Sequence, residues 1–285
     1  ISIPSGGAAA YYGVKAEDYI TSGDGSASNP YNASAIQNAI NALPTRGGIV
    51  FIKEGIWRGT SRIQLPGAAS DHNKRITLQG AGAPRSHIYE MSGNDGLSGT
   101  HIQAGIDMYR PCDLYDLTIA PHPDNYNAAG HDSLRIVYDR TRHATDYAYL
   151  SGFNVERCRF WRGDYGIHFT GVNMGAVFWQ MAQVVIRDIS ITLCNRGFRM
   201  DRDEFDSTAA SQGFRGRFLH WDIRSCTSGR GFDYDISSSK AEVGYILLEG
   251  CGAVAGDYAL WMKTAGDGGV YVHHIDTGDG SVSPK

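Results

Sequence analysis

VERCRFWRGDYGIHFT, residues 155–170, has a counterpart in LEGCGAVAGDYALWMK, residues 248–263, where Glu, Cys and the triplet Gly-Asp-Tyr recur at a constant offset of 93 residues. Two further segments lie between them, DISITLCNRGFRMD and DIRSCTSGRGFDYD. All four align when one column holds Gly166, Gly197, Gly231 and Ala259. The steps along this column are 31, 34 and 28 residues. Such a period indicates a solenoid, in which each coil of the chain stacks on the next.

Apolar residues also recur at fixed places in these segments. One expected inward column holds Leu117, Cys158, Ile189, Ile223 and Cys251, and the next holds Ile119, Phe160, Ile191 and Ala253. A single coil cannot bury its apolar edge, whereas stacked coils build a continuous core and pair their backbones in parallel ladders. A β-sandwich with accidental similarity is the alternative, but sandwich strands rarely repeat at this spacing with matching inward residues.

The first strong local signal is a short amphipathic helix. In NASAIQNAINALP, residues 32–44, one apolar stripe holds Ile36, Ile40 and Leu43 before Pro44 ends the helix. Ser34 and Gln37 have the spacing of a capping box, an interpretation that we favour over an N-glycosylation sequon at the same residues.

After this helix the hydrophobic period changes from 3.6 to 2, beginning with GGIVFIKEGIW at residues 47–57. Helical patterns do not return. A long run of strands without alternating helices excludes a doubly wound α/β fold.

Composition narrows the class of protein. The formal net charge is −4 and the chain contains no run rich in Lys or Arg, which argues against nucleic acid as a partner. No stretch of about 18 apolar residues predicts a membrane span. The chain begins at Ile1 rather than Met, as expected of a processed or excised product. The five cysteines lack metal or redox spacing and are expected to be buried core residues: Cys112, Cys158, Cys194, Cys226 and Cys251.

We therefore predict an all-β fold over residues 1–285, a single-stranded right-handed parallel β-helix with three strands per coil and a short N-terminal capping α-helix. Residues 1–48 would hold the N-terminal segment and this helix, residues 49–275 the coils, and residues 276–285 a tail. No helix follows the last coil, and an uncovered parallel edge invites pairing. We expect a homo-oligomer, such as a trimer, or a continuation into a further domain.

The opening motifs resemble those of a known superfamily. AIQNAINAL, GGIVFIKEGIW and ITLQGAGAPRSHI are similar to the amino-terminal signature of the pectate-lyase-like β-helix superfamily, which includes pectinases, polygalacturonase-like hydrolases and phage tailspike depolymerases. The resemblance spans residues 17–90 by motif and continues by coil pattern. It implies a polysaccharide partner and an extracellular, cell-surface or virion-associated location. It also implies that Gly80-Ala81-Gly82 is a turn between coils rather than a dinucleotide-binding loop.

The catalytic motifs of these families are absent. The chain has neither the Asn-x-Asp, Asp-Asp and Gly-His-Gly set of polygalacturonases nor the Arg-x-Pro-x-x-Arg element of pectate lyases. The resemblance therefore implies only where a cleft would lie, namely along the strands GIHFT, GFRMD, GFDYD and ALWMK.

Strand alternation predicts which side chains these strands turn outward. One outward column holds Arg135, His168, Arg199, Asp233 and Trp261, and the next holds Val137, Thr170, Asp201, Asp235 and Lys263. Adjacent coils lie about 4.8 Å apart, so Asp201, Asp233 and Asp235 would form a carboxylate cluster. Like charges at this distance raise one pKa and can set a protonated acid beside an ionised base. These three aspartates are the candidate catalytic residues.

Neighbouring side chains suit a sugar substrate. Trp261 offers a stacking surface, and Lys263 and Arg199 could hold the carboxylate of an acidic sugar. The segment from residue 121 to 151 and the loop at residues 201–213 are long enough to wall a groove. The candidate substrate-binding residues are His168, Arg199, Trp261, Lys263 and Glu204.

Three functions remain open at this point. The first is a glycoside hydrolase that cleaves an extracellular polysaccharide, without a cofactor. The second is a polysaccharide lyase acting on an acidic glycan, for which the same aspartates could hold Ca²⁺. The third is a non-catalytic solenoid that binds glycan or neighbouring molecules, with the aspartates simply solvated.

Overall fold

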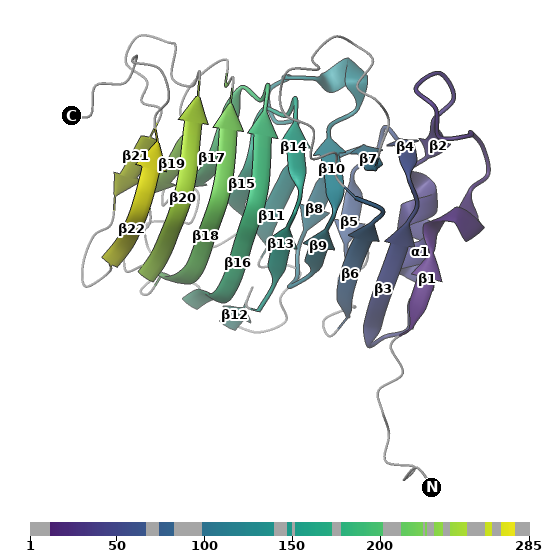
Figure 1. Ribbon diagram of the computed structural model, residues 1–285. Helices are drawn as coiled ribbons and strands as arrows, with labels where there is room; N and C mark the ends of the chain where they lie inside the picture. Colours follow the sequence, from purple (N-terminus) through teal and green to yellow (C-terminus); the bar gives the residue numbers. More distant parts are fainter. Residues whose placement is uncertain are drawn as a thin grey trace, which may run out of the picture.

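The computed structural model describes residues 12–66, 74–82, 99–139, 147–149, 152–172, 178–201, 212–224, 226, 231–235, 240–249, 260–263 and 269–276. These residues form two parallel β-sheets and one α-helix. In Figure 1 the fifteen-stranded sheet faces the viewer and the seven-stranded sheet lies behind it. The prediction of a mainly β chain with parallel pairing is confirmed.

The seven-stranded sheet has the order β21-β19-β17-β15-β11-β8-β5. Its strands, in chain order, are β5 (Ile63–Leu65), β8 (Ile106–Met108), β11 (Leu134–Asp139), β15 (Tyr165–Val172), β17 (Arg196–Asp201), β19 (Phe232–Asp235) and β21 (Leu260–Lys263). Each strand pairs in parallel with the strand one coil away, as expected of a solenoid.

The fifteen-stranded sheet contains two rows that merge. The first row is β1 (Gly13–Lys15), β3 (Gly47–Ile52), β6 (Arg75–Gly80), β9 (Asp113–Tyr115) and β13 (Asn154–Glu156). The second row is β2 (Tyr31–Asn32), β4 (Gly55–Arg58), β7 (Thr100–Gln103), β10 (Leu117–Ala120) and β14 (Arg159–Trp161). Both rows join at β16, and the remaining strands are β12 (Tyr147–Tyr149), β16 (Phe178–Thr192), β18 (Gln212–Arg224), β20 (Lys240–Glu249) and β22 (Gly269–Asp276).

The prediction of three strands per coil holds for the first coils and needs a correction for the later ones. From β16 onward the first two strands of a coil run on as one, and β16 is 15 residues long. The change occurs at a backbone bend that recurs at the same place in successive coils. A residue with positive φ occupies this bend in successive coils: Asp116, Arg157, Asp188 and His220. The bend separates strands at Asp116 and Arg157 but lies within β16 and β18.

The glycine column is confirmed and has a steric cause. Strand pairing sets Ile167 opposite Phe198, and Phe198 opposite Phe232, as the shared column requires. A Cβ at Gly197 would lie 2.1 Å from the carbonyl oxygen of Gly231, and one at Gly166 would lie 2.8 Å from that of Gly197. Only glycine lets consecutive coils approach this closely.

One predicted inward column was wrong on the opposite sheet. Ile119, Phe160 and Ile191 do pair in register, as predicted. The residue that pairs with Ile191 in the next coil is Ile223, which the sequence period assigns to the Ile189 column. The partner of Ile223 in the next coil is Leu248. Cys251 and Ala253 lie outside the described residues.

The helix α1 (Ser34–Ala42) closes the N-terminal end of the core, as predicted, with Ile36 and Ile40 fully buried. The predicted capping box is wrong, because the N-cap is Ala33 and has no side-chain hydrogen bond. Ser34 is instead the first helical residue. Two short 3-10 helices complete the described elements, η1 (Ala16–Tyr19) and η2 (Pro123–Asn125).

The cysteine prediction is confirmed where it can be checked. The four described cysteines are buried, and no disulfide joins any two of them: Cys112, Cys158, Cys194 and Cys226. Burial raises the pKa of the Cys112 and Cys158 thiols to about 12. In the part of the chain that the structure describes, no helix is long and apolar enough to cross a membrane.

Candidate functional site

One continuous row of polar residues runs across the outward face of the seven-stranded sheet. Strand register places the row in the order Gln64, Asp107, Arg135, His168, Arg199, Asp233 and Trp261. The residues on either side of it in β15 and β17 point into the core, since Ile167, Phe169, Phe198 and Met200 are fully buried. The predicted column from Arg135 to Trp261 is therefore confirmed in register, and the structure extends it to Asp107 and Gln64.

At the β8–β11 end of the row, Asp107 joins two arginines. Arg62 Nε donates to Asp107 Oδ1 at 2.6 Å, and Arg135 Nη2 donates to Oδ2 at 2.6 Å. The Asp107 side chain is only 3% exposed. Burial by itself would raise the pKa of Asp107, but hydrogen bonds and charge from Arg135 and Arg62 outweigh it and lower that pKa. Asp107 is thus held ionised and occupied by its partners.

One strand further, Asp132 and His168 form a buried pair. The carboxylate Oδ2 of Asp132 lies 2.9 Å from His168 Nδ1, and its Oδ1 accepts the backbone N–H of Tyr165 at 3.0 Å. The side chains of Asp132 and His168 are 3% and 13% exposed. Because a carboxylate only accepts hydrogen bonds, Nδ1 of the ring donates, and Nε2 points away from Asp132. This arrangement orients an imidazole for proton transfer.

Tyr165 packs against this imidazole and binds two arginines. Its ring stacks on that of His168 with 4.4 Å between centroids. Its hydroxyl accepts hydrogen bonds from Arg199 Nη1, at 2.8 Å, and from Arg196 Nη1. Two guanidinium groups at one phenolic oxygen concentrate positive charge beside His168. The carboxylates nearest these guanidinium groups are those of Asp132, which pairs with His168, and Asp233, which lies opposite Arg199 in register.

The predicted catalytic aspartates lie on β17 and β19. Register sets Asp201 directly opposite Asp235, and Asp233 opposite Arg199. Asp233 is buried, with 8% exposure. Neighbouring strands are about 4.8 Å apart and alternate residues of one strand about 6.6 Å apart, so the three backbone positions are adjacent on one face. The orientation of the Asp201 and Asp235 side chains lies outside what the structure describes.

Of the remaining predicted binding residues, the structure gives only the backbone register of Trp261 and Lys263, and Glu204 lies outside the described residues. Trp261 pairs with Asp233 and Lys263 pairs with Asp235, which continues both outward columns onto β21. Their side chains are outside the described part of the chain, and Glu204 is outside it entirely. His168 and Arg199 are the predicted binding residues whose side chains the structure brings together, through Tyr165.

Sequence reasoning missed Asp107, Asp132 and Tyr165. A signal for two of them was available. Asp132 and Tyr165 each stand two residues before an inward residue of their strand, and those inward residues, Leu134 and Ile167, are paired in register. The repeated triplet Gly-Asp-Tyr also contains Tyr165. The triplet marks this position, which has the parity of inward residues, and Asp132 stands at the same position one coil earlier.

The described part of the segment expected to wall a groove has contacts on both sides. In the loop at residues 121–131, Tyr126 contacts Trp161 with 5.4 Å between ring centroids, and its hydroxyl accepts from Gln103 Nε2 at 3.2 Å. Trp161 and Gln103 belong to β14 and β7 of the fifteen-stranded sheet. Gly130 N–H also donates to Asp164 Oδ2 at 2.9 Å, and Asn195 Nδ2 donates to the Asn127 carbonyl at 2.7 Å, so the loop contacts the residues directly before β15 and β17 as well.

Among the described residues, no three His, Cys, Asp or Glu side chains gather as a metal site would require. The side chains of Asp201 and Asp235 are not within this search. Calcium binding by the aspartates therefore stays a prediction.

Comparison with known proteins gives distant structural likenesses. No protein-family model and no curated protein matches the chain. The catalytic domain of Agl-KA superposes with a TM-score of 0.49 and 13% identity, over 96% of this chain and 47% of that chain. The catalytic unit of a thermostable GH87 alpha-1,3-glucanase from Streptomyces thermodiastaticus strain HF3-3 superposes with a TM-score of 0.43 and 17% identity, over 87% and 42%. This chain thus spans about half the length of the solved structures it resembles.

Proposed function

We propose that this chain is a carbohydrate-active protein with a right-handed parallel β-helix, and that it hydrolyses a polysaccharide along the outward face of the seven-stranded sheet. The observation that carries the proposal is the register of β17 and β19, which sets Asp201 opposite Asp235 with Asp233 beside them. Like charges directly opposite each other destabilise a strand pair. A catalytic function of Asp201 and Asp235 would explain why two like charges occupy opposite positions on neighbouring strands.

Glycoside hydrolysis needs two carboxyl groups in different protonation states. Groups about 5 Å apart suit a retaining nucleophile, and groups about 6.5–9.5 Å apart suit an inverting base with its water. Asp201 and Asp235 act as acid and as base or nucleophile, and the charge of Asp233 separates their pKa values. The sugar is held by His168, Arg199, Trp261, Lys263 and Glu204.

The test is a panel of neutral and acidic polysaccharides with a reducing-end assay. Asp201→Asn and Asp235→Asn are each expected to lower turnover about 1000-fold, because one member of the pair is lost. Asp188→Asn is the control, since Asp188 lies on β16 of the other sheet. If Asp201→Asn, Asp235→Asn and a further variant, Asp233→Asn, all keep wild-type turnover, hydrolysis at this cluster is refuted. If the panel is bound but never cleaved, the non-catalytic glycan-binding function replaces it.

A polysaccharide lyase is the second candidate, and one observation favours it. Asp132 orients His168, while Tyr165 holds Arg199 at the same place. In this reaction Arg199 binds the carboxylate of a uronic acid, and His168 Nε2 removes the proton from C5. The electron pair forms a C4=C5 double bond as the C4–O bond breaks, and the leaving oxygen takes a proton from a neighbouring acid. Calcium held by carboxylates would neutralise the uronate.

Isotope labelling separates the two reactions. Hydrolysis in ¹⁸O-labelled water puts the label into the new reducing end, whereas elimination gives an unlabelled, unsaturated product that absorbs in the ultraviolet. Loss of activity with a chelator, restored by Ca²⁺, would further support elimination.

We also propose an extracellular, cell-surface or virion-associated location, because polysaccharides of this kind lie outside cells. The edge at β22 and β21 ends each sheet in the described residues. A homo-oligomer, such as a trimer, or a further domain would cover that edge. Light scattering on the full chain tests the oligomer.

A further inference from the structure

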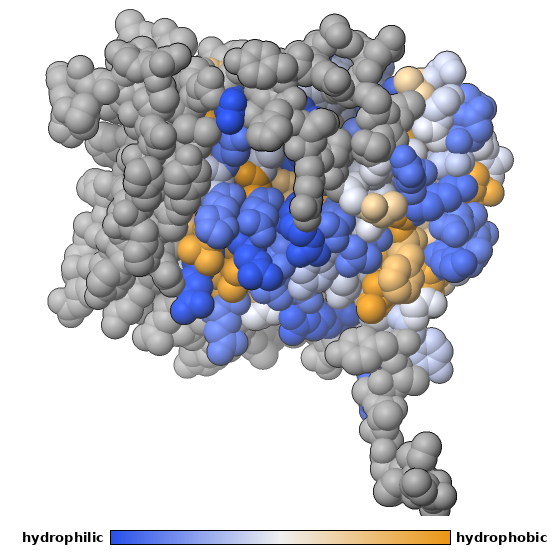
Figure 2. Space-filling model, in the orientation of Figure 1, coloured by the Kyte–Doolittle hydropathy of each residue, from blue (hydrophilic) through white to orange (hydrophobic). Residues whose placement is uncertain are grey.

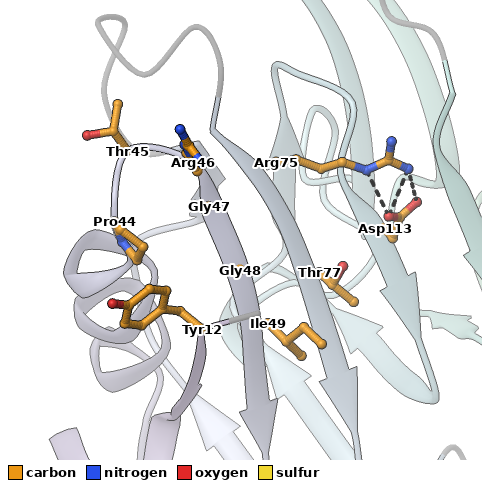
Figure 3. A pocket seen from close by; sticks show the side chains of 10 residues that line it. All are labelled: Tyr12, Pro44, Thr45, Arg46, Gly47, Gly48, Ile49, Arg75, Thr77 and Asp113. Atoms are coloured by element: carbon orange, nitrogen blue, oxygen red, sulfur yellow. Dashed lines mark hydrogen bonds and ion pairs between the residues drawn. The ribbon is translucent and has the colours of Figure 1, made fainter. Parts of the chain in front are cut away.

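A second candidate site lies on the outer face of the fifteen-stranded sheet, near its N-terminal end. It is a cavity of about 810 Å³, a size within the range of small-molecule sites. Figure 3 shows the residues that line it: Tyr12, Pro44, Thr45, Arg46, Gly47, Gly48, Ile49, Arg75, Thr77 and Asp113. These residues belong to β3, β6 and β9 and to the segments before β1 and β3. The polar row described above lies on the other sheet.

The local sequence builds this cavity where helix α1 gives way to β3. Pro44 follows the helix, and Gly47 and Gly48 begin the strand. Gly47 has a φ of +85°, and a Cβ there would lie 1.8 Å from the carbonyl oxygen of Arg75. A Cβ at Gly48 would lie 2.3 Å from the carbonyl oxygen of Tyr12. The two glycines thus let β3 lie tightly between its neighbours, which sets Tyr12 and Arg75 on either side.

One wall of the cavity is aromatic and apolar. Tyr12 is 59% exposed, and it and Phe51 are the exposed large hydrophobic residues in the described part of the chain. Ile49, whose N–H donates to the Tyr12 carbonyl at 2.9 Å, continues this wall. In Figure 2 hydrophobic residues gather near β3, beside a hydrophilic area over the middle of the same face. An exposed tyrosine ring is a suitable stacking surface for the apolar face of a sugar.

The opposite wall is charged and fixed in place. Arg75 Nη2 donates to Asp113 Oδ2 at 3.1 Å and to the Gly152 carbonyl at 2.7 Å, and Nε donates to Asp113 at 3.3 Å. Asp113 also accepts the N–H of Asn154 at 2.9 Å. The acceptor oxygens of Asp113 are therefore occupied, while the Arg75 side chain is 56% exposed.

Several donors in the cavity have no protein partner among the described residues. Arg75 Nη1 takes no part in the hydrogen bonds drawn in Figure 3, and Arg46, Thr77 and the Tyr12 hydroxyl likewise bind no described protein group. The formal charges of Arg46 and Arg75 exceed that of Asp113 by one. A neutral ligand would leave this charge uncompensated when it displaced water, whereas an anionic group would bind it through charge-assisted hydrogen bonds.

We infer that this cavity binds an acidic sugar unit of a glycan chain. The sugar ring stacks on Tyr12, and its carboxylate accepts hydrogen bonds from Arg46 and Arg75 Nη1, while Thr77 donates to a ring substituent. The site is non-catalytic and holds a chain to the protein away from the seven-stranded sheet. It goes beyond the proposed function, because binding here requires no turnover at Asp201 or Asp235.

Calorimetric titration of the full chain tests this inference. The probes are trigalacturonate and trimannuronate, with maltotriose as the neutral counterpart and sodium sulfate as a simple anion. All titrations use the Asp235→Asn variant as well as the unaltered chain, so that turnover does not interfere. At least one acidic trisaccharide is expected to bind about tenfold more tightly than maltotriose, since a charge-assisted bond is lost with the neutral sugar.

Three variants locate the binding. Arg46→Gln and Tyr12→Ala are each expected to weaken the acidic trisaccharide about tenfold. Lys15→Gln removes an exposed positive charge of β1 outside the cavity and is expected to change binding less than about twofold. The inference is overturned if neither acidic probe binds, if Arg46→Gln and Tyr12→Ala leave binding unchanged, or if sulfate competes as well as the sugar. It is also overturned if Lys15→Gln weakens binding as much as Arg46→Gln does.

Discussion

The outward face of the seven-stranded sheet has two parts that differ in how their charges are arranged. On β8 and β11, opposite charges alternate, and Asp107 binds Arg62 and Arg135 in short, buried hydrogen bonds. On β17 and β19, register instead sets two carboxylates, Asp201 and Asp235, opposite each other. The first arrangement stabilises strand pairing and the second opposes it. One end of this face thus pairs opposite charges, and the other end carries the carboxylates of the proposed site.

The largest effect should come from breaking the first part. Asp107→Asn leaves Arg62 and Arg135 without their carboxylate in a buried place, and we expect a loss of about 3 kcal/mol in the free energy of unfolding. Urea unfolding followed by circular dichroism measures it. Asp124→Asn is the matched control, because that carboxylate is 86% exposed in η2 and its loss should be close to neutral. A loss below about 1 kcal/mol for Asp107→Asn would mean that the pair is not structural.

The next effect concerns His168 on β15, a strand that lies between the two parts. His168→Gln removes the imidazole that Asp132 orients, and we expect about 100-fold slower cleavage of an acidic polysaccharide, about 2.7 kcal/mol in activation free energy. Stability should change by less than about 1 kcal/mol. The chain offers a matched histidine–aspartate pair on the other sheet, in which His220 Nδ1 lies 3.2 Å from Asp188. His220→Gln should leave cleavage unchanged, and equal losses in both variants would contradict the assignment.

A smaller effect on the free energy of unfolding is expected when the pH is lowered. The folded protein lowers the pKa of Asp107 below its ordinary value of 3.8. The stabilisation from ionised Asp107 is therefore complete above about pH 4 and is lost as the pH falls through the folded-state pKa. The difference in unfolding free energy between the unaltered chain and Asp107→Asn should stay constant from about pH 7 to 5 and shrink below about pH 4. A difference that grew on acidification would refute the pKa direction.

The smallest effect is expected at the cysteines of the core, which lies beneath the seven-stranded sheet. Burial raises the pKa of the Cys112 and Cys158 thiols to about 12, so they stay protonated and inert near pH 8. In a Cys251→Ser variant, an aromatic disulfide reagent should label no thiol of the folded protein and four in urea. Rapid labelling of the folded variant would show that the core opens.

The face that carries the candidate site was the more predictable one. Its columns were correct from Arg135 to Trp261 because Gly166, Gly197 and Gly231 each stand directly before the first inward residue that was aligned and tie the sequence period to the coil. On the other sheet the same period misplaced Ile223 by two residues. In one coil, the inward Ile191 of the fifteen-stranded sheet stands 7 positions before the inward Phe198 of the seven-stranded sheet. In the next coil, the equivalent residues Ile223 and Phe232 are 9 positions apart.

The site itself was only partly predictable. Alternation identified His168, Arg199 and Asp233 as outward residues of paired strands, because the direction of a side chain in a strand follows from its parity. Asp132 and Tyr165 were missed because both have the parity of inward residues; Asp132 lies just before β11, and Tyr165 is the first residue of β15. Arg62 was missed because it binds Asp107 from the preceding coil, 45 residues away.

By itself, the sequence determined the stacking of coils, the inward residues of the seven-stranded sheet and the order of residues in its outward row. These features follow from the repeat length and from the two-residue period of strands, both of which can be read directly from the sequence. Only the tertiary structure decided that Asp107 is occupied by two arginines, that Tyr165 lies between His168 and Arg199, and that a cavity opens between β3 and β9. These depend on turn lengths and side-chain directions that bring residues from different coils together, and no sequence period encodes them.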